Sequence, residues 1–102
     1  MIVNTSRITV YPEKRAEFLQ TVAELIEPIK GSKGCLTFHL YVDVTDENSS
    51  LLIGEWETES DLNEYLHSAD FAILHGAITV LSRRCSDFKA IANGVTNTIQ
   101  EA

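Results

Sequence analysis

The chain of 102 residues predicts a single α+β domain with elements in the order strand, helix, strand, strand, helix, strand. Three observations support this order: segments of alternating polarity, stretches with apolar residues at helical spacing, and short polar stretches between them. The order is that of a ferredoxin-like, split βαβ fold with an antiparallel sheet. No repeat or linker divides the chain. We therefore expect one domain over residues 1–102, with a core at about 2–92 and a polar tail at 93–102.

The first part of the chain predicts a strand followed by a helix. Residues Ile2–Tyr11 alternate in polarity and are rich in β-branched side chains, which is typical of a strand. Pro12 can begin a helix, and apolar residues then recur at spacings of three and four over residues 13–30. Pro28 should end or kink this helix near Glu27, because proline lacks the N–H that a helix needs.

The middle of the chain predicts a β-hairpin. Cys35–Val44 alternates, the polar stretch Thr45–Ser50 is typical of a turn, and Leu51–Glu57 is the expected return strand. A glycine inside a strand often marks a bulge or the close approach of another backbone. We expect one of these at Gly54.

The last part predicts a helix in two pieces and a final strand. The hydroxyl residues Thr58 and Ser68 each precede an apolar helical stripe and an acidic first turn, as N-caps do. The final strand is expected at Arg84–Ala92. In the predicted strand order Cys35 and Cys85 lie on opposite edge strands, so an intrachain disulfide is not expected.

Charge and composition exclude several classes of function. Eight Lys and Arg against 15 Asp and Glu give a net charge of −7, which is opposite to the basic surface of a nucleic-acid or anionic-lipid binder. No apolar run approaches the roughly 20 residues that span a bilayer. The first residues lack the basic and apolar regions of a signal peptide, and the two cysteines form no disulfide framework. We expect a cytoplasmic protein with no nucleic-acid or membrane partner.

Short motifs along residues 2–92 resemble the antibiotic-biosynthesis monooxygenase family. They are Gly34 at the start of the second strand, the Glu55–Trp56 pair near the end of the third, and Ser68–Phe71 at a helix start. The resemblance implies a homodimeric α/β barrel, with two sheets face to face and the helices outside. It also implies oxidation of small phenolic, quinol-type or polycyclic aromatic substrates by O2, with no metal, flavin or other cofactor.

Such chemistry requires an apolar pocket and a group that favours the substrate anion, because the substrate itself reduces O2. His75 is the first candidate catalytic residue, since an imidazole changes protonation near neutral pH and lies in helical register with Phe71. Tyr65 is the second and stands where many relatives have a histidine. A tyrosine with an ordinary pKa of about 10 is a poor base, so the base role moves toward His75.

The remaining candidates would bind substrate. Trp56 matches the family's tryptophan, and Phe71 lies on the apolar stripe of its helix. Asn4 and Ser6 share one face of the first strand, and His39 and Tyr41 share one face of the second. The full set of candidate substrate-binding residues is Trp56, Asn4, Ser6, Tyr41, His39 and Phe71. Each also has a simpler interpretation as a packing residue or a locally hydrogen-bonded one.

Two other functions stay open at this point. A haem-degrading relative would use His75 as the iron ligand, but Tyr65 and Ser6 replace the tryptophan and asparagine of such proteins. A non-catalytic small-molecule binder, or an isomerase of phosphorylated sugars, would suit the fold. Against phosphate, the chain has no glycine-rich cradle and no convergent basic cluster except Arg83–Arg84.

Overall fold

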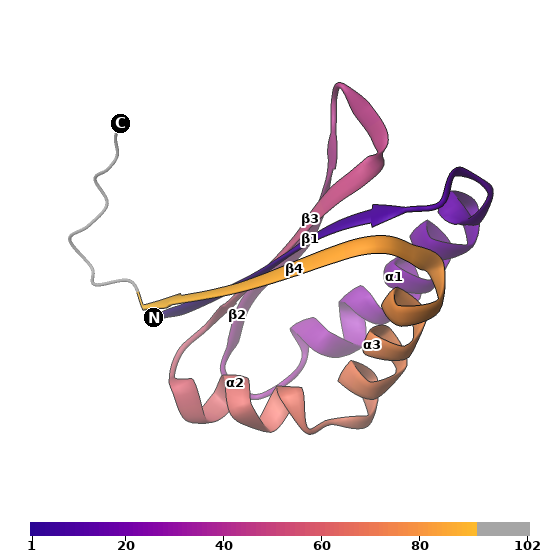
Figure 1. The fold of residues 1–102 in the computed structure, drawn as a ribbon. Coiled ribbons are helices and arrows are strands. Elements are labelled where there is room, and N and C mark those ends of the chain that lie inside the picture. The colour runs from indigo at the N-terminus through magenta and orange to yellow at the C-terminus, as the bar shows by residue number, and fades with distance from the viewer. Residues whose placement is uncertain (92–102) are drawn as a thin grey trace, which may run out of the picture.

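An antiparallel sheet with helices packed on one face forms the structure, a computed structural model that describes residues 1–91 (Figure 1). The elements in chain order are β1 (Ile2–Val10), the 3-10 turn η1 (Pro12–Lys14), α1 (Arg15–Lys30), β2 (Cys35–Asp43), β3 (Asp46–Trp56), α2 (Glu59–Leu66), α3 (Ala69–Leu81) and β4 (Ser82–Ile91). The predicted α+β, ferredoxin-like class is confirmed. The expected tail at 93–102 and Ala92 of the expected last strand lie outside the described residues.

The sheet has the strand order β2-β3-β1-β4, and every neighbouring pair is antiparallel. β1 lies in the interior, where Ile2 is opposite Trp56 on one side and Ile91 on the other. β2 and β4 are the edges, so Cys35 and Cys85 are far apart in the sheet and both are free thiols. Among the described helices, none is long and apolar enough to cross a membrane.

Two hydroxyl caps divide the second helical region, as the sequence predicts. The Thr58 side chain accepts a hydrogen bond from the Asp61 backbone N–H, and Ser68 accepts one from the Phe71 N–H. Each cap satisfies one of the amide groups that the first turn of a helix leaves unpaired.

The structure corrects the predicted end of the first helix. α1 continues through Pro28 to Lys30 instead of ending near Glu27. Pro28 lies in the last turn, where it removes a single helical hydrogen bond, and the Gly31 N–H still closes the helix onto the Glu27 carbonyl at 3.1 Å.

The structure also corrects the predicted hairpin turn. Residues Asp46–Ser50 belong to β3, and the turn consists of 44–45 alone. Two pairings extend the strand through this polar stretch: Ser49 lies opposite Thr9 of β1, and Asp46 lies opposite Asp43 of β2. The last strand likewise begins at Ser82, two residues before the predicted start.

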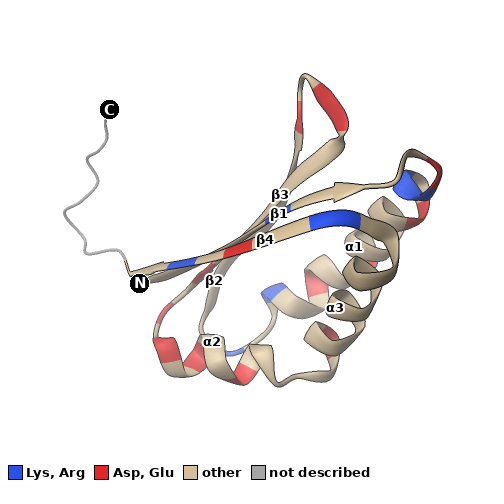
Figure 2. Ribbon diagram, viewed as in Figure 1, with Lys and Arg blue, Asp and Glu red and all other residues tan. Residues whose placement is uncertain are grey.

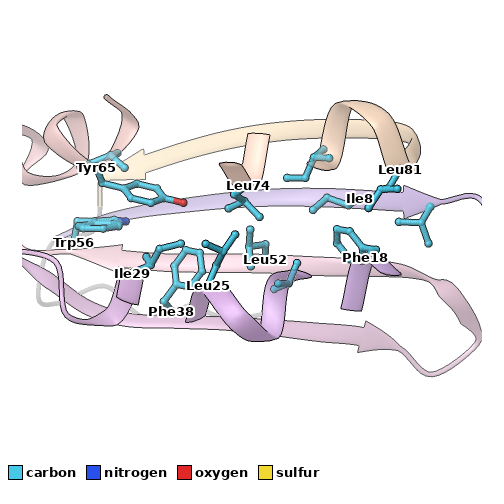
Figure 3. Close-up of a cluster of buried hydrophobic side chains, with 14 of the residues drawn as sticks. Ile8, Phe18, Leu25, Ile29, Phe38, Leu52, Trp56, Tyr65, Leu74 and Leu81 are labelled. Carbon is cyan, nitrogen blue, oxygen red and sulfur yellow. The ribbon is translucent and has the colours of Figure 1, made fainter. Parts of the chain in front are cut away.

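The side chains that fill the core come from both layers (Figure 3). Fifteen apolar residues are buried, and the largest of them, Trp56, has no exposed surface. Phe38, Leu52 and Ile8 are buried on the helix side of the sheet. Leu36 does not follow this pattern and is 51% exposed, because the β2–β3 register shifts between Cys35 and Thr37.

Charged side chains are scattered over the described elements, and no stripe of basic residues follows any one of them (Figure 2). This agrees with the net charge of −7. The opposite face of the sheet is covered by no element of the described chain.

Candidate functional site

A cavity of about 350 Å³ lies between the sheet and α3. This volume falls in the range of small-molecule sites, roughly 300–1,000 Å³. Its lining combines aromatic and aliphatic side chains with polar groups from the strands and from α3. The lining residues that bear on function are Asn4, Ser6, Gly54, Tyr65, Phe71, His75, Cys85 and Asp87.

Stacked aromatic rings form one end of the cavity. Tyr65 lies flat on Trp56, with ring centroids 4.7 Å apart and an interplanar angle of 22°. Phe71 and Phe38 each meet Tyr65 edge-on, at 5.2 Å and 6.0 Å. Such offset and edge-to-face contacts hold aromatic rings in defined positions. Trp56 is therefore a support behind Tyr65, while Tyr65 and Phe71 face the cavity.

The Tyr65 side chain is only 3% exposed, and its hydroxyl points along the sheet toward Leu74 (Figure 3). Burial raises the pKa of this phenol far above its ordinary value, with smaller contributions from Cys35 and Asp70. Tyr65 is therefore neutral at physiological pH. It can donate a hydrogen bond to a ligand oxygen, but it cannot act as a base.

α3 supplies the opposite wall. Phe71, Leu74 and Ile78 follow the helical spacing of three and four, so they share the side that faces the sheet. His75 lies at the margin of this side, where it lines the cavity and remains exposed to solvent. Its ring is 5.6 Å from the Phe71 ring. Within the described chain no side-chain hydrogen bond engages the His75 imidazole, so both ring nitrogens are available to a ligand.

β1 and β4 form the floor. Asn4 and Ser6 point to the helix side of β1, and the register places Ser6 opposite Asp87 of β4. The Ser6 hydroxyl donates to Asp87 Oδ1 at 2.6 Å, and the Cys85 thiol lies 3.8 Å from the same oxygen. Burial and the Asp87 carboxylate raise the pKa of the Cys85 thiol. The floor thus holds a carboxylate and a neutral thiol.

Six of the eight predicted site residues lie at this cavity. Tyr65, His75, Asn4, Ser6 and Phe71 line it, and Trp56 supports it from behind. His39 and Tyr41 lie elsewhere, because they alternate with the buried Phe38 and point to the uncovered face of the sheet. They contact each other there, with rings 5.8 Å apart. A ligand in this cavity cannot touch them, and any other role for them stays a prediction.

Sequence reasoning missed three residues of the site. Gly54 was expected to mark a bulge or a nearby backbone, but its pairing with Asn4 and Phe38 is regular. Its lack of a side chain instead makes room for the Trp56 and Phe38 rings. Cys85 and Asp87 were not assigned to the pocket. Their alternation does place them on one face of β4, but both faces of that strand carry charges, so the pattern does not say which face meets the helices.

Metal-ligand side chains do not gather anywhere in the described chain: no three of His, Cys, Asp and Glu lie close enough to hold an ion. The polar side chains at the cavity are instead spread along its wall among aromatic and aliphatic residues. Their chemistry is hydrogen bonding and proton transfer to a flat, largely apolar ligand.

Comparisons with known proteins find a matching family model and a shared fold. The sequence model of the family described as "Antibiotic biosynthesis monooxygenase" matches residues 1–77. YcnE, a proposed monooxygenase of Bacillus subtilis, is 31% identical over 71 residues, which are 70% of this chain and 75% of that protein. The Synechocystis protein sll1783 is 31% identical over 70 residues, 69% of this chain and 48% of that protein, so the matched region is about half of that relative's length.

Solved structures share the fold. A crystal structure of an antibiotic biosynthesis monooxygenase has a TM-score of 0.84 and 23% identity, covering 91% of this chain and 99% of the other. A proposed member from Deinococcus radiodurans has a TM-score of 0.88 and 15% identity, with coverage of 98% and 100%. At these identities the similarity supports the fold alone.

Proposed function

The chain belongs to the antibiotic biosynthesis monooxygenase family, and from this premise we propose that it oxidises a small phenolic or quinol-type aromatic with O2, without a cofactor. The observation that carries the proposal is the cavity of about 350 Å³, walled by Tyr65 and Phe71 and bordered by the unengaged imidazole of His75. Such a space fits a flat aromatic molecule, and the imidazole provides a base at its edge.

In this proposal the substrate supplies all the electrons. His75 accepts the proton of a phenolic or quinol hydroxyl, and neutral Tyr65 donates a hydrogen bond to a substrate oxygen. The electron-rich anion then reduces O2. One oxygen atom is bonded to a ring carbon that loses its hydrogens, and the other leaves as water. For an anthrone, CH2 plus O2 becomes C=O plus H2O, so atoms and electrons balance with no external reductant.

The test is oxygen uptake by the purified full chain with a panel of quinols and anthrones, without added metal or flavin. We expect uptake with at least one substrate and a loss of about 10²-fold or more in His75→Ala, the usual size of a general-base contribution. His67→Ala is the matched control, because the His67 imidazole is exposed and bonds only the carbonyl of its own helix, at 2.8 Å. Equal rates in both variants contradict the role of His75.

The alternatives predict different outcomes. Absence of uptake across the panel contradicts the monooxygenase and favours a non-catalytic binder or an isomerase. A haem titration that shifts the Soret band in the wild type but not in His75→Ala favours haem degradation instead. Uptake without any haem response supports the proposal.

We also propose that the working unit is a homodimer that covers the free face of the sheet. This face carries apolar side chains in the open, among them Tyr41 at 55% and Phe88 at 60% exposure. A large exposed apolar patch is typical of an interaction surface. Sedimentation should give about 23 kDa, twice the chain mass of 11.4 kDa. A species of 11.4 kDa at micromolar concentration would contradict the dimer.

A further inference from the structure

We infer that the Asp87 carboxylate makes the cavity selective for neutral hydroxylated aromatics over otherwise similar anionic ones, by accepting a hydrogen bond from the ligand's hydroxyl. Asp87 is thereby a specificity-determining residue that the family resemblance does not assign. The inference rests on the proposed function for the reaction that follows binding, whereas its test measures binding alone.

The carboxylate is held in place with one oxygen available. The Ser6 hydroxyl donates to Oδ1 at 2.6 Å, and the Cys85 thiol approaches the same oxygen at 3.8 Å. No donor of the described residues reaches Oδ2. Ser6 and Cys85, which hold the carboxylate, lie in the floor of the cavity. The free Oδ2 of Asp87 therefore lies beside the space that a ligand would occupy. Hydrogen bonds to an ionised acceptor are roughly twice as strong as those between neutral groups.

Nothing in the cavity wall neutralises this charge. Among the described lining residues there is no Lys or Arg, and His75 is the single side chain there that can become positive. Lys89 lies two residues beyond Asp87 on the same strand face, but its ammonium pairs with Glu59 at 2.5 Å. Arg84 alternates with Cys85 and therefore points to the other face of the sheet.

This arrangement treats two kinds of ligand differently. A phenolic or quinol hydroxyl can donate to the free oxygen of Asp87. A ligand that carries a carboxylate, sulfonate or phosphate instead brings a like charge toward an uncompensated carboxylate, in a protein whose net charge is already −7. Asp87 is exposed, so solvent weakens the repulsion between like charges a few ångströms apart, but at low ionic strength it does not remove it.

The experiment compares 2-naphthol with 6-hydroxy-2-naphthoate, which differ by one carboxylate. Binding is followed through the fluorescence of Trp56, the single tryptophan of the chain, which stacks on Tyr65 at the cavity. We expect the wild-type affinity ratio, naphthol over naphthoate, to fall about tenfold in Asp87→Asn at low salt. A tenfold change corresponds to about 1.4 kcal/mol. The wild-type ratio should also shrink in about 0.5 M salt, because an exposed carboxylate is screened.

Glu24→Gln is the matched control. It removes one negative charge from an exposed position on the outer helix α1, so the ratio should remain within about twofold of the wild type. Asp87→Thr, a neutral residue that favours strands, should reproduce the result of Asp87→Asn if charge is the cause. Circular dichroism confirms that each variant is folded.

The outcomes separate this inference from the proposed function. A ratio unchanged by both Asp87 substitutions overturns the inference, whatever the oxygen-uptake assay reports. Failure of 2-naphthol to bind the wild type also overturns it. If Asp87→Asn loses the preference for 2-naphthol and the wild type shows no oxygen uptake, the inference is supported and only the proposed monooxygenase activity is contradicted.

Discussion

Gly54 offers a sharp test of how the sheet and the aromatic end of the cavity fit together. A Cβ added at this position lies 2.9 Å from Trp56 Nε1 and 3.1 Å from Phe38 Cδ1. The first separation is shorter than real Cβ atoms show, so Gly54→Ala forces a neighbour to move. The Trp56 ring cannot yield easily, because it is fully buried and stacks on Tyr65 at 4.7 Å.

The expected cost follows from these contacts. Overpacking a well-packed core by a methyl group costs about 1–3 kcal/mol. Replacing glycine also removes conformational freedom from the unfolded chain, which stabilises the folded state by about 0.4–1 kcal/mol. We therefore expect Gly54→Ala to lower the free energy of unfolding by about 1–2 kcal/mol. For a domain of this size that lowers the melting temperature by very roughly 4–16 °C.

Gly76→Ala is the control with the opposite sign. Gly76 lies on an exposed position of α3, and a Cβ there meets nothing within 4 Å. Alanine is the better helix former by about 0.8–1.0 kcal/mol, so this variant should be more stable than the wild type. The same chemical change thus destabilises in the sheet and stabilises in the helix.

The assay is urea unfolding followed by Trp56 fluorescence, with circular dichroism as a second probe. Gly54→Ala should also change the fluorescence of the folded state, because the Trp56–Tyr65 stack must open or tilt. An unfolding midpoint of Gly54→Ala at or above that of the wild type would refute the packing argument. So would an equal effect of the two alanine variants, since the structure gives them opposite surroundings.

Ser68→Ala removes the side-chain acceptor for the Phe71 N–H and should lower the free energy of unfolding by about 1 kcal/mol in a urea titration, whereas Ser68→Asn should retain most of the stability. Burial raises the pKa of Tyr65, so the stability that its neutral hydroxyl contributes is complete below the ordinary tyrosine pKa of about 10 and is lost as pH rises above it. Between about pH 9 and 11 the free energy of unfolding of Tyr65→Phe should therefore decline less than that of the wild type, as measured by urea midpoints. Parallel declines of the two proteins would contradict this prediction. Burial and the Asp87 carboxylate raise the pKa of the Cys85 thiol. At about pH 8 this thiol should therefore react with iodoacetamide more slowly than an unperturbed cysteine, and faster in Asp87→Asn than in the wild type. Peptide mass spectrometry measures both rates.

Much of the fold was predictable because the signals are local. Thr58 and Ser68 mark helix starts by a hydroxyl and an acidic turn, and the structure places both caps there. The errors occur where strand pairing, or the position of a residue within its helix, decides the outcome. Residues Asp46–Ser50 look like a turn, yet Ser49 and Ser50 pair with β1 and Asp46 pairs with β2, which makes the stretch part of a strand. Pro28 signals a break, yet it falls where a helix tolerates one missing bond.

The candidate site was predictable in part for the same reason. His75 and Phe71 share a helix face, so spacing alone relates them, and the aromatic character of Tyr65 and Trp56 indicated an apolar wall. His39 and Tyr41 were grouped with them, because alternation assigns residues to two faces of a strand without saying which face meets the helices. The register between distant strands settled that question.

Composition, spacing and short motifs were enough to predict the order of the elements, the acidic surface and the family, because these features are recorded locally in the chain. The residues that meet in the cavity follow from the folded arrangement. Ser6 and Asp87 are 81 residues apart, and a hydrogen bond of 2.6 Å joins them because β4 returns antiparallel beside β1. Contacts of this kind depend on strand register, which is set by the packing of the whole sheet against its helices and leaves no local trace in the chain.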